Sequence, residues 1–472
     1  MRVQLKFIGL FIILIFESCV QDQPPFRPAS FYALNAISEN RIQFKKSLIE
    51  ETILKNLATP LDSVHESNWQ AAFWGIELAL FRTDTVFQAL KRAFANFSQR
   101  SLAFQRALLE VSFCLYPGQF QTEITAIAQS TGNPKIFAMA IHYLVNGKTG
   151  ISGEARLHSP DDSTFVYRKN GSSIKSVFAP NSESAAKKFY LKLLKKRFPD
   201  WPNQPILFML AQALQTTKPI QLQQRPPLLD LLKHPFEKEK TVIYTFQRAD
   251  RNYPGLTVIK KPDGKFMRTV DGRLFQIPHL GRSIANLPGY LTNGNTPQGI
   301  FSIQGIDTSP NVFIGPSPNL QLALPFEISL PDYFHHSDLT DTTWSKATYQ
   351  KLLPDSWHNY LPIYEAFYAG AAGRTEIIAH GTTIDPTFYQ GKTYFPNTPS
   401  LGCLTAKEIW SDADGQCLVS DQIAFMNAFL STGTQEGYLV VVELDDKPRP
   451  IVIDEILIPI LQAEGYLVKD LK

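Results

Sequence analysis

The residues best able to do chemistry are a histidine and a cysteine in the second half of the chain. His380 ends the apolar run Ile377-Ile378-Ala379, and Cys403 follows 23 residues later, behind the turn Ser400-Leu401-Gly402. Cysteine attacks as the thiolate, so its pKa must be lowered by a nearby base or cation. A histidine close in space would supply that base and hold an ion pair with the thiolate. A glycine before the cysteine lets backbone N–H groups approach a reacting carbonyl, as an oxyanion hole requires.

The pair alone is weak evidence for catalysis, because structural cysteines are common. A third segment, Thr296-Pro297-Gln298-Gly299-Ile300-Phe301, precedes both residues. The three segments, in this order within about 110 residues, resemble the pattern of the YkuD-type L,D-transpeptidases. That pattern is Thr-Pro-x-Gly-x-Phe, then His-Gly, then Ser/Thr-x-Gly-Cys, in bacterial cell-wall enzymes with a β-rich catalytic core. The resemblance covers residues 240–445 and does not reach the first half of the chain.

The resemblance implies a role for each matching residue of the two catalytic segments. Cys403 would be the nucleophile and His380 the general base, and Ser400 would help to orient the histidine. The backbone N–H groups of Gly402 and Cys403 would stabilise the oxyanion. The chemistry runs through a thioester on the cysteine, so no metal or cofactor is expected.

The implied activity is the crosslinking of peptidoglycan stem peptides, which are then the expected substrate and partner. Two alternatives stay open. Water instead of an amine could resolve the thioester, which would make the protein an L,D-carboxypeptidase or a hydrolase of wall peptides. The sequence does not separate these activities, because acceptor choice depends on pocket shape. The chain could also be a non-catalytic lipoprotein scaffold that binds the wall, which the Thr405 departure and the large helical half favour.

The residues that would hold the substrate match the family less well. Gly381 and Thr382, directly behind the histidine, are expected to contact it. Thr405 stands two positions after the cysteine, where the family commonly has an Arg or Asn that helps to hold substrate. Arg374 lies six residues before the histidine and would share its face in a regular strand, so it is either the missing substrate cation or a surface charge.

Two further features have competing interpretations. The long loop 381–399 contains Tyr389, Tyr394 and Phe395, which would either shape a lid or pack into the core. The neighbouring pair His335-His336 suggests a metal site only by its adjacency. Because side chains next to each other in sequence diverge on a strand or a helix, we expect no metal there.

The elements that must position these residues differ between the two halves of the chain. Residues 41–235 predict a mostly α-helical N-terminal domain, with helices starting near 67, 101 and 133. That spacing fits either degenerate helical repeats or an irregular bundle. From residue 240, β-branched and aromatic runs separated by turn residues predict a mostly β domain that extends to 445. Residues 446–472 form a tail, predicted to end in an amphipathic helix.

The N-terminus has the features of a targeting signal. Arg2 and Lys6 precede ten residues, Phe7 to Phe16, which are too few to span a bilayer. Ser18 followed by Cys19 resembles a relaxed bacterial lipoprotein signal, so residues 1–18 would be removed and Cys19 lipidated. Residues 19–40 would then be a tether, and the protein a periplasmic, membrane-anchored lipoprotein. A plain secretory signal or an uncleaved anchor is the alternative.

Composition limits the remaining classes of partner. The 472 residues carry a net charge of +3 and are 44% hydrophobic, which excludes a wholly disordered chain and argues against a dedicated nucleic-acid binder. Residues 41–240 carry a charge of +10 and residues 241–472 a charge of −7. This asymmetry fits two domains with different partners, a contact between the domains, or ordinary solvated surfaces. One hypothesis is that the helical half holds the protein at the anionic wall or at a partner protein. Without Cys19 an odd number of cysteines remains, and whether Cys114 and Cys417 pair is open.

Overall fold

The computed structural model describes residues 25–146, 183–215, 224–236, 239–340 and 342–467. The expected signal sequence, Cys19 and all of residues 147–182 lie outside these ranges. Lipidation therefore stays a prediction. In the part of the chain that is described, no helix is long and apolar enough to cross a membrane.

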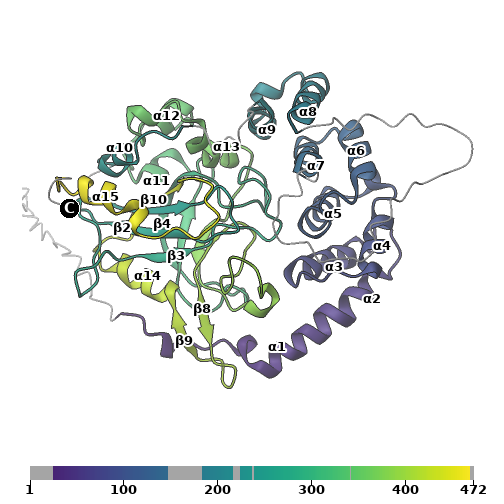
Figure 1. The fold of residues 1–472 in the computed structure, drawn as a ribbon, viewed down its shortest axis with the longest axis horizontal. Coiled ribbons are helices and arrows are strands. Elements are labelled where there is room, and N and C mark those ends of the chain that lie inside the picture. The colour runs from purple at the N-terminus through teal and green to yellow at the C-terminus, as the bar shows by residue number, and fades with distance from the viewer. Residues whose placement is uncertain (1–24, 147–182, 216–223, 237–238, 341, 468–472) are drawn as a thin grey trace, which may run out of the picture.

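The first half of the chain is helical, as predicted. A long helix runs through α1 (Ser38–Phe44), a π-helical stretch and α2 (Ile53–Leu57). Seven further helices follow: α3 (Glu66–Leu78), α4 (Asp84–Ala93), α5 (Leu102–Leu115), α6 (Gln121–Ser130), α7 (Pro134–Asn146), α8 (Glu183–Arg197) and α9 (Pro205–Gln215). Helices α3, α5, α7 and α9 form an inner row that faces the β region, with α4, α6 and α8 outside it (Figure 1).

Local capping explains where the inner helices begin. The side chain of Ser101 accepts the Phe104 N–H at the start of α5, and the Asn133 side chain accepts the N–H groups of Lys135 and Ile136 at the start of α7. The helix starts predicted near 67, 101 and 133 fall within one residue of the observed α3, α5 and α7.

The second half is built on an eight-stranded sheet, so the prediction of a mostly β region is confirmed. The strand order is β3-β2-β1-β10-β4-β5-β6-β7. Its strands are β1 (Thr241–Gln247), β2 (Gly255–Lys260), β3 (Ile277–His279), β4 (Gly299–Asp307), β5 (Asn319–Ala323), β6 (Ile378–His380), β7 (Leu404–Thr405) and β10 (Glu436–Glu443). Leu280 and Thr405 exchange backbone hydrogen bonds, so the two edges of the sheet meet and it is nearly closed into a barrel.

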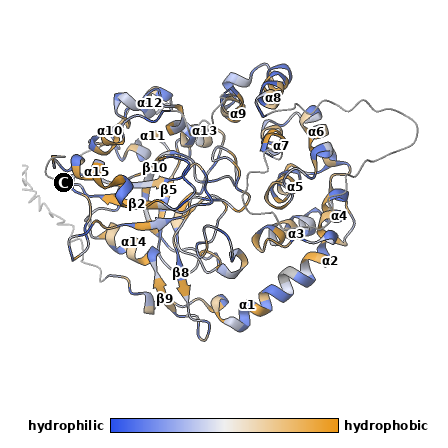
Figure 2. Cartoon of the chain, in the orientation of Figure 1, coloured by the Kyte–Doolittle hydropathy of each residue, from blue (hydrophilic) through white to orange (hydrophobic). Residues whose placement is uncertain are grey.

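Both faces of this sheet are apolar and both are covered. One face packs on α14 (Asp421–Leu430), and the other packs on α10 (Leu228–Lys233), α11 (Leu330–Phe334), α12 (Lys346–Gln350), α13 (Glu365–Ala371) and α15 (Asp454–Ala463). Every residue of β1 is buried, as expected for a strand covered on both sides. Figure 2 shows both hydrophobic and hydrophilic residues on α14 and α15, as expected for helices that bury only one side.

The structure differs from the expected boundaries at two places. Helix α10, expected in the helical domain, packs on the β region, where Tyr244 donates a hydrogen bond to the Leu231 carbonyl. The segment expected as a tether, residues 19–40, contacts the β region from Phe26 onward. Phe26 exchanges hydrogen bonds with Asn427 of α14, and Tyr32 pairs with Gln416 beside the small sheet of β8 (Glu408–Trp410) and β9 (Cys417–Ser420).

The helical and β regions share one hydrophobic core. Ala285, Leu287, Tyr290 and Leu291, from a loop of the β region, are buried in the same cluster as the inner helices. The loop that carries them, residues 284–296, is called the bridging loop below. The helical region is therefore packed against the β region rather than joined to it through a linker alone.

Candidate active site

The structure brings His380 and Cys403 onto neighbouring strands. Strands β6 and β7 are parallel, with Ala379 beside Leu404 and His380 beside Thr405. Cys403 immediately precedes β7 and lies against the start of β6, where its thiol approaches the Glu376 carbonyl at 3.6 Å. Within the described residues, no hydrogen bond joins the thiol directly to His380. The two residues thus lie on neighbouring strands, and a direct bond between their side chains would have to form in the substrate complex.

His380 is held in the tautomer that a general base needs. The side chain is buried, and its Nδ1 lies 2.5 Å from the Gly381 carbonyl oxygen. A carbonyl only accepts, so Nδ1 carries the proton and Nε2 keeps its lone pair. Burial lowers the pKa of His380 to about 4, against a smaller opposing effect of the Gly381 carbonyl. The imidazole is therefore neutral near pH 7.

Cys403 rests as a thiol. Burial raises the pKa of its thiol, while the Ile378 N–H and the Arg374 guanidinium lower it by less. Because the pKa of His380 is lowered and that of Cys403 is raised, the expected thiolate–imidazolium ion pair is not the resting state. Proton transfer from the thiol to His380 would therefore have to take place during attack on a carbonyl.

Ser400 shapes the turn before the cysteine, which corrects its expected role. Its hydroxyl accepts the Gly402 N–H at 3.0 Å and donates to the Cys403 carbonyl at 3.0 Å. The serine thus orients the turn rather than His380. The backbone N–H groups of Gly402 and Cys403 were both predicted to stabilise the oxyanion. Because the Gly402 N–H is bonded to Ser400, only the Cys403 N–H of these two could do so. The Thr296 hydroxyl also donates to the Gly402 carbonyl at 2.9 Å, which ties the first sequence motif to the third.

Arg374 is neither a surface charge nor a free ligand for a substrate carboxylate. It does not lie on β6, because Glu376 adopts a left-handed backbone conformation (φ 62°) between the two. Its side chain is buried and donates to three backbone carbonyls of the bridging loop: Gly289, Gly294 at 2.7 Å and Asn295 at 2.8 Å. Burial lowers the pKa of Arg374 to about 10, with Glu365 and Cys403 opposing that shift.

Gly381 and Thr382 serve a buried carboxyl group instead of facing a substrate. The Thr382 N–H donates to Glu408 Oε2 at 3.0 Å, and a Cβ at Gly381 would lie 2.2 Å from the Glu408 carboxyl. Glu408 also accepts hydrogen bonds from the hydroxyls of Ser317 and Ser420. Burial nevertheless raises the pKa of Glu408 to about 7. The sequence carried no signal for this group, because Glu408 matches no motif and lies on a strand of three residues.

The tyrosines of loop 381–399 are core residues rather than a lid. Tyr389 and Tyr394 are buried in a small cluster with Leu280. The Tyr389 hydroxyl donates to the Leu78 carbonyl of α3 at 2.9 Å. Phe395 alone of the three aromatic residues stays substantially exposed. The loop thus fastens the helical region beside the candidate site.

Thr405 does not replace the missing substrate cation, since its buried hydroxyl donates to the Thr398 carbonyl at 2.7 Å.

The His335 ring contacts the Ser302 hydroxyl and the Gly437 carbonyl. Among the described residues, no cluster of three or more His, Cys, Asp or Glu side chains could hold a metal ion. Cys114, Cys403 and Cys417 are all free thiols, so Cys114 and Cys417 do not pair.

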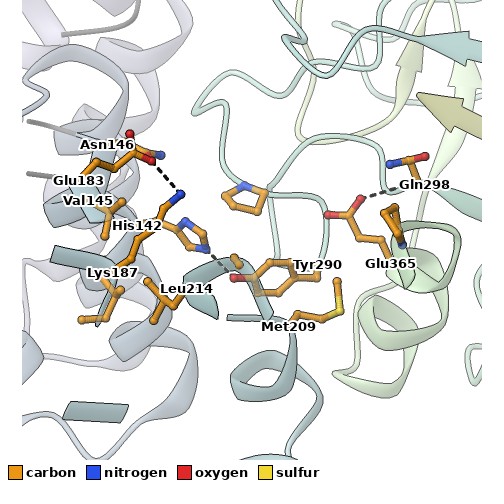
Figure 3. Close-up of a pocket in the computed structure, with 14 residues that line it drawn as sticks. His142, Val145, Asn146, Glu183, Lys187, Met209, Leu214, Tyr290, Gln298 and Glu365 are labelled. Carbon is orange, nitrogen blue, oxygen red and sulfur yellow. Dashed lines mark hydrogen bonds and ion pairs between the residues drawn. The ribbon is translucent and has the colours of Figure 1, made fainter. Parts of the chain in front are cut away.

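A pocket of about 250 Å³ lies between the helical and β regions, apart from Cys403 and His380. Figure 3 shows His142 of α7 directed at Tyr290 of the bridging loop, with Glu365 and Gln298 on the far side. The His142 Nε2 and the Tyr290 hydroxyl are 2.5 Å apart, and burial lowers the pKa of His142 to about 4. Of these residues only Gln298 belongs to a sequence motif, the Thr296–Phe301 segment.

Comparisons of this chain with protein-family models, curated proteins and solved structures give no match. The case for a function therefore depends on the sequence motifs and on the geometry of the candidate site.

Proposed function

We propose that this protein is a peptidoglycan L,D-transpeptidase, with Cys403 as the nucleophile and His380 as the general base. One observation carries the proposal. A neutral histidine whose Nδ1 is bonded to the Gly381 carbonyl lies on the strand beside the glycine turn that presents Cys403. The ordered Thr-Pro-x-Gly-x-Phe, His-Gly and Ser-x-Gly-Cys segments add the resemblance to the YkuD-type enzymes.

The reaction follows from these two side chains. As the Cys403 thiol attacks the carbonyl carbon of the diamino acid at stem position three, its proton passes to His380 Nε2. The new C–S bond displaces the amine of the terminal D-alanine, which leaves with that proton. An amine from another stem then attacks the thioester and gives its proton to the histidine. The crosslinking amide forms, and the cysteine regains its proton.

The proposed setting is the periplasm, with a lipid on Cys19 as the membrane anchor. The basic helical half would hold the enzyme near the anionic wall or a partner protein, since residues 41–240 carry a charge of +10. Attraction of this kind weakens as salt screens the charges. Wall binding that is insensitive to salt would count against this part of the proposal.

A non-catalytic scaffold is the alternative that one observation favours. The guanidinium of Arg374 donates to backbone carbonyls, and Thr405 is a buried threonine, so neither residue supplies a cation for the substrate carboxylate. The neutral histidine beside the cysteine favours the enzyme.

The test is incubation of the full chain, purified in detergent, with tetrapeptide muropeptides and analysis of the products by mass spectrometry. Cys403→Ala is the inactive variant and Cys417→Ala the matched control, because Cys417 is a buried thiol in a separate cluster. Loss of D-alanine with new dimers, absent only in Cys403→Ala, is the expected result. Tripeptide without dimers would indicate a carboxypeptidase. If neither the tetrapeptide nor a crosslinked substrate changes, the non-catalytic scaffold becomes the better account of the protein.

A further inference from the structure

The bridging loop, residues 284–296, is clamped on one side by the helical region. Lys135 of α7 donates to the Thr292 hydroxyl at 2.7 Å, and Asn293 donates to the carboxyl group of Glu110 on α5 at 3.1 Å. The Cys114 thiol of α5 donates to the Ile284 carbonyl at 3.4 Å. Farther along, Tyr290 contacts His142 of α7 (Figure 3). Two inner helices thus hold this loop through polar contacts as well as through the shared core.

The other side of the same loop supports the turn that carries Cys403. Arg374 donates to the carbonyls of Gly289, Gly294 and Asn295, which fixes three positions of the loop at once. A Cβ at Gly402 would lie 2.0 Å from Arg374 Nη2 and 2.5 Å from the Gly294 carbonyl oxygen. The guanidinium therefore lies between the bridging loop and the turn, in direct contact with both.

Few acidic groups besides the Cys403 thiol act on the charge of Arg374. The side chain is 4% exposed, and the acidic groups that act on its charge are the buried Glu365 and the Cys403 thiol. A buried cation without full compensation is costly and favours a negative charge on its neighbour. A guanidinium beside a thiol stabilises the thiolate, the form that attacks.

We infer that Arg374 is a positioning residue, through which the helical region sets the reactivity of Cys403. The guanidinium holds the Ser400–Cys403 turn against the bridging loop and stabilises the thiolate, while α5 and α7 keep that loop in place. Loosening the loop from the helical side moves the guanidinium away from the thiol. This inference extends the proposed function, since it concerns the same cysteine, but it needs only that Cys403 be reactive.

The experiment measures the rate at which iodoacetamide alkylates Cys403 between pH 6 and 10, in the full chain in detergent. Peptide mapping separates Cys403 from the other thiols, and circular dichroism reports the folded state. Removing a nearby opposite charge shifts a pKa by about one unit or more. Arg374→Met is therefore expected to raise the pH of half-maximal rate by about one unit, which lowers the rate about tenfold at each pH below that point. Arg374→Lys keeps the charge and is expected to bring back most of the wild-type rate.

Asn293→Asp tests the helical side without touching the turn, because it places a carboxylate against Glu110. The pH of half-maximal alkylation is expected to rise, by less than in Arg374→Met. The control is Gln88→Glu, which makes the same amide-to-carboxylate change on the exposed side of α4 and should leave the pH profile unchanged. Should Arg374→Met fail to fold, Asn293→Asp and Arg374→Lys decide. An unchanged profile in a folded Asn293→Asp protein, or one shifted in the opposite direction, overturns the inference. The alkylation needs no wall substrate, so its outcome is separate from that of the muropeptide assay.

Discussion

The guanidinium of Arg374 occupies the space that a side chain at Gly402 would need. A Cβ built on Gly402 lies 2.0 Å from Nη2, and the glycine has a φ of 123°, in the range that other residues rarely adopt. The glycine before Cys403 is thus required twice, by the conformation of the turn and by the buried cation behind it.

Gly402→Ala is expected to reduce both stability and the reactivity of Cys403. The steric conflict and the backbone strain together should cost at least about 2 kcal/mol of unfolding free energy. Gly373→Ala is the matched control, because Gly373 also has a positive φ but nothing lies within 4 Å of its Cβ position. Urea unfolding measures both variants. Equal losses in the two would show that Arg374 does not restrict the turn.

The pH dependence of acylation should reflect the buried histidine. The pKa of His380 is lowered to about 4, so the imidazole stays neutral and able to accept a proton down to about pH 5. The rate at which a carbapenem acylates Cys403 should accordingly lose half its value near pH 4 on the acidic side. Stopped-flow or quenched measurements from pH 3.5 to 8 would show this. A midpoint near 6.5 would mean that the histidine is solvated in the working enzyme.

Glu408→Gln should change how stability depends on pH. The pKa of Glu408 is raised to about 7 in the folded protein, from 4.5. Between these values the unfolded chain has lost a proton that the folded chain retains, so stability falls as the pH rises, by up to about 3 kcal/mol. The unfolding free energy of the wild type minus that of the variant should therefore fall from pH 5 to pH 7.5. Glu39→Gln, on the exposed start of α1, serves as the control. An identical pH slope in wild type and Glu408→Gln would contradict the burial of this charge.

Leu287→Ala should weaken the contact between the helical and β regions. Leu287 is fully buried in the core that the two regions share, and such truncations typically cost about 2–5 kcal/mol. Leu34→Ala removes the same atoms from an exposed side chain and should change little. Thermal unfolding followed by circular dichroism should show one cooperative transition in the wild type. Two separate transitions in the wild-type protein would contradict the shared core.

The sequence predicted the parts of the site that depend on local pattern. The helical periodicity and the β-rich second half follow from residue types and spacing over short distances. The resemblance placed His380 near the Ser400–Cys403 turn, and strands β6 and β7 do lie side by side. The interpretation of the tyrosines as core residues was already one of the two alternatives, and the structure supports it.

The roles that were wrong depend on contacts between distant segments. Arg374 meets carbonyls some 80 residues away in the chain, and Gly381 is restricted by Glu408, 27 positions later. The spacing of hydrophobic residues along the sequence does not indicate contacts between such distant segments. Family analogy placed Thr382 near the reaction and strand spacing placed Arg374 there, but both residues contact other segments. Ser400 differs, because its hydroxyl bonds within its own turn.

The most direct test of the central claim is the intact mass of the full chain after incubation with a carbapenem. The resemblance to YkuD-type enzymes implies that an active cysteine is acylated by such a compound. Wild type and Cys417→Ala should each gain the mass of one inhibitor, mapped by peptide analysis to Cys403, and Cys403→Ala should gain none. A wild-type protein that stays unmodified, or an adduct that persists in Cys403→Ala, would contradict the assignment of Cys403 as the nucleophile.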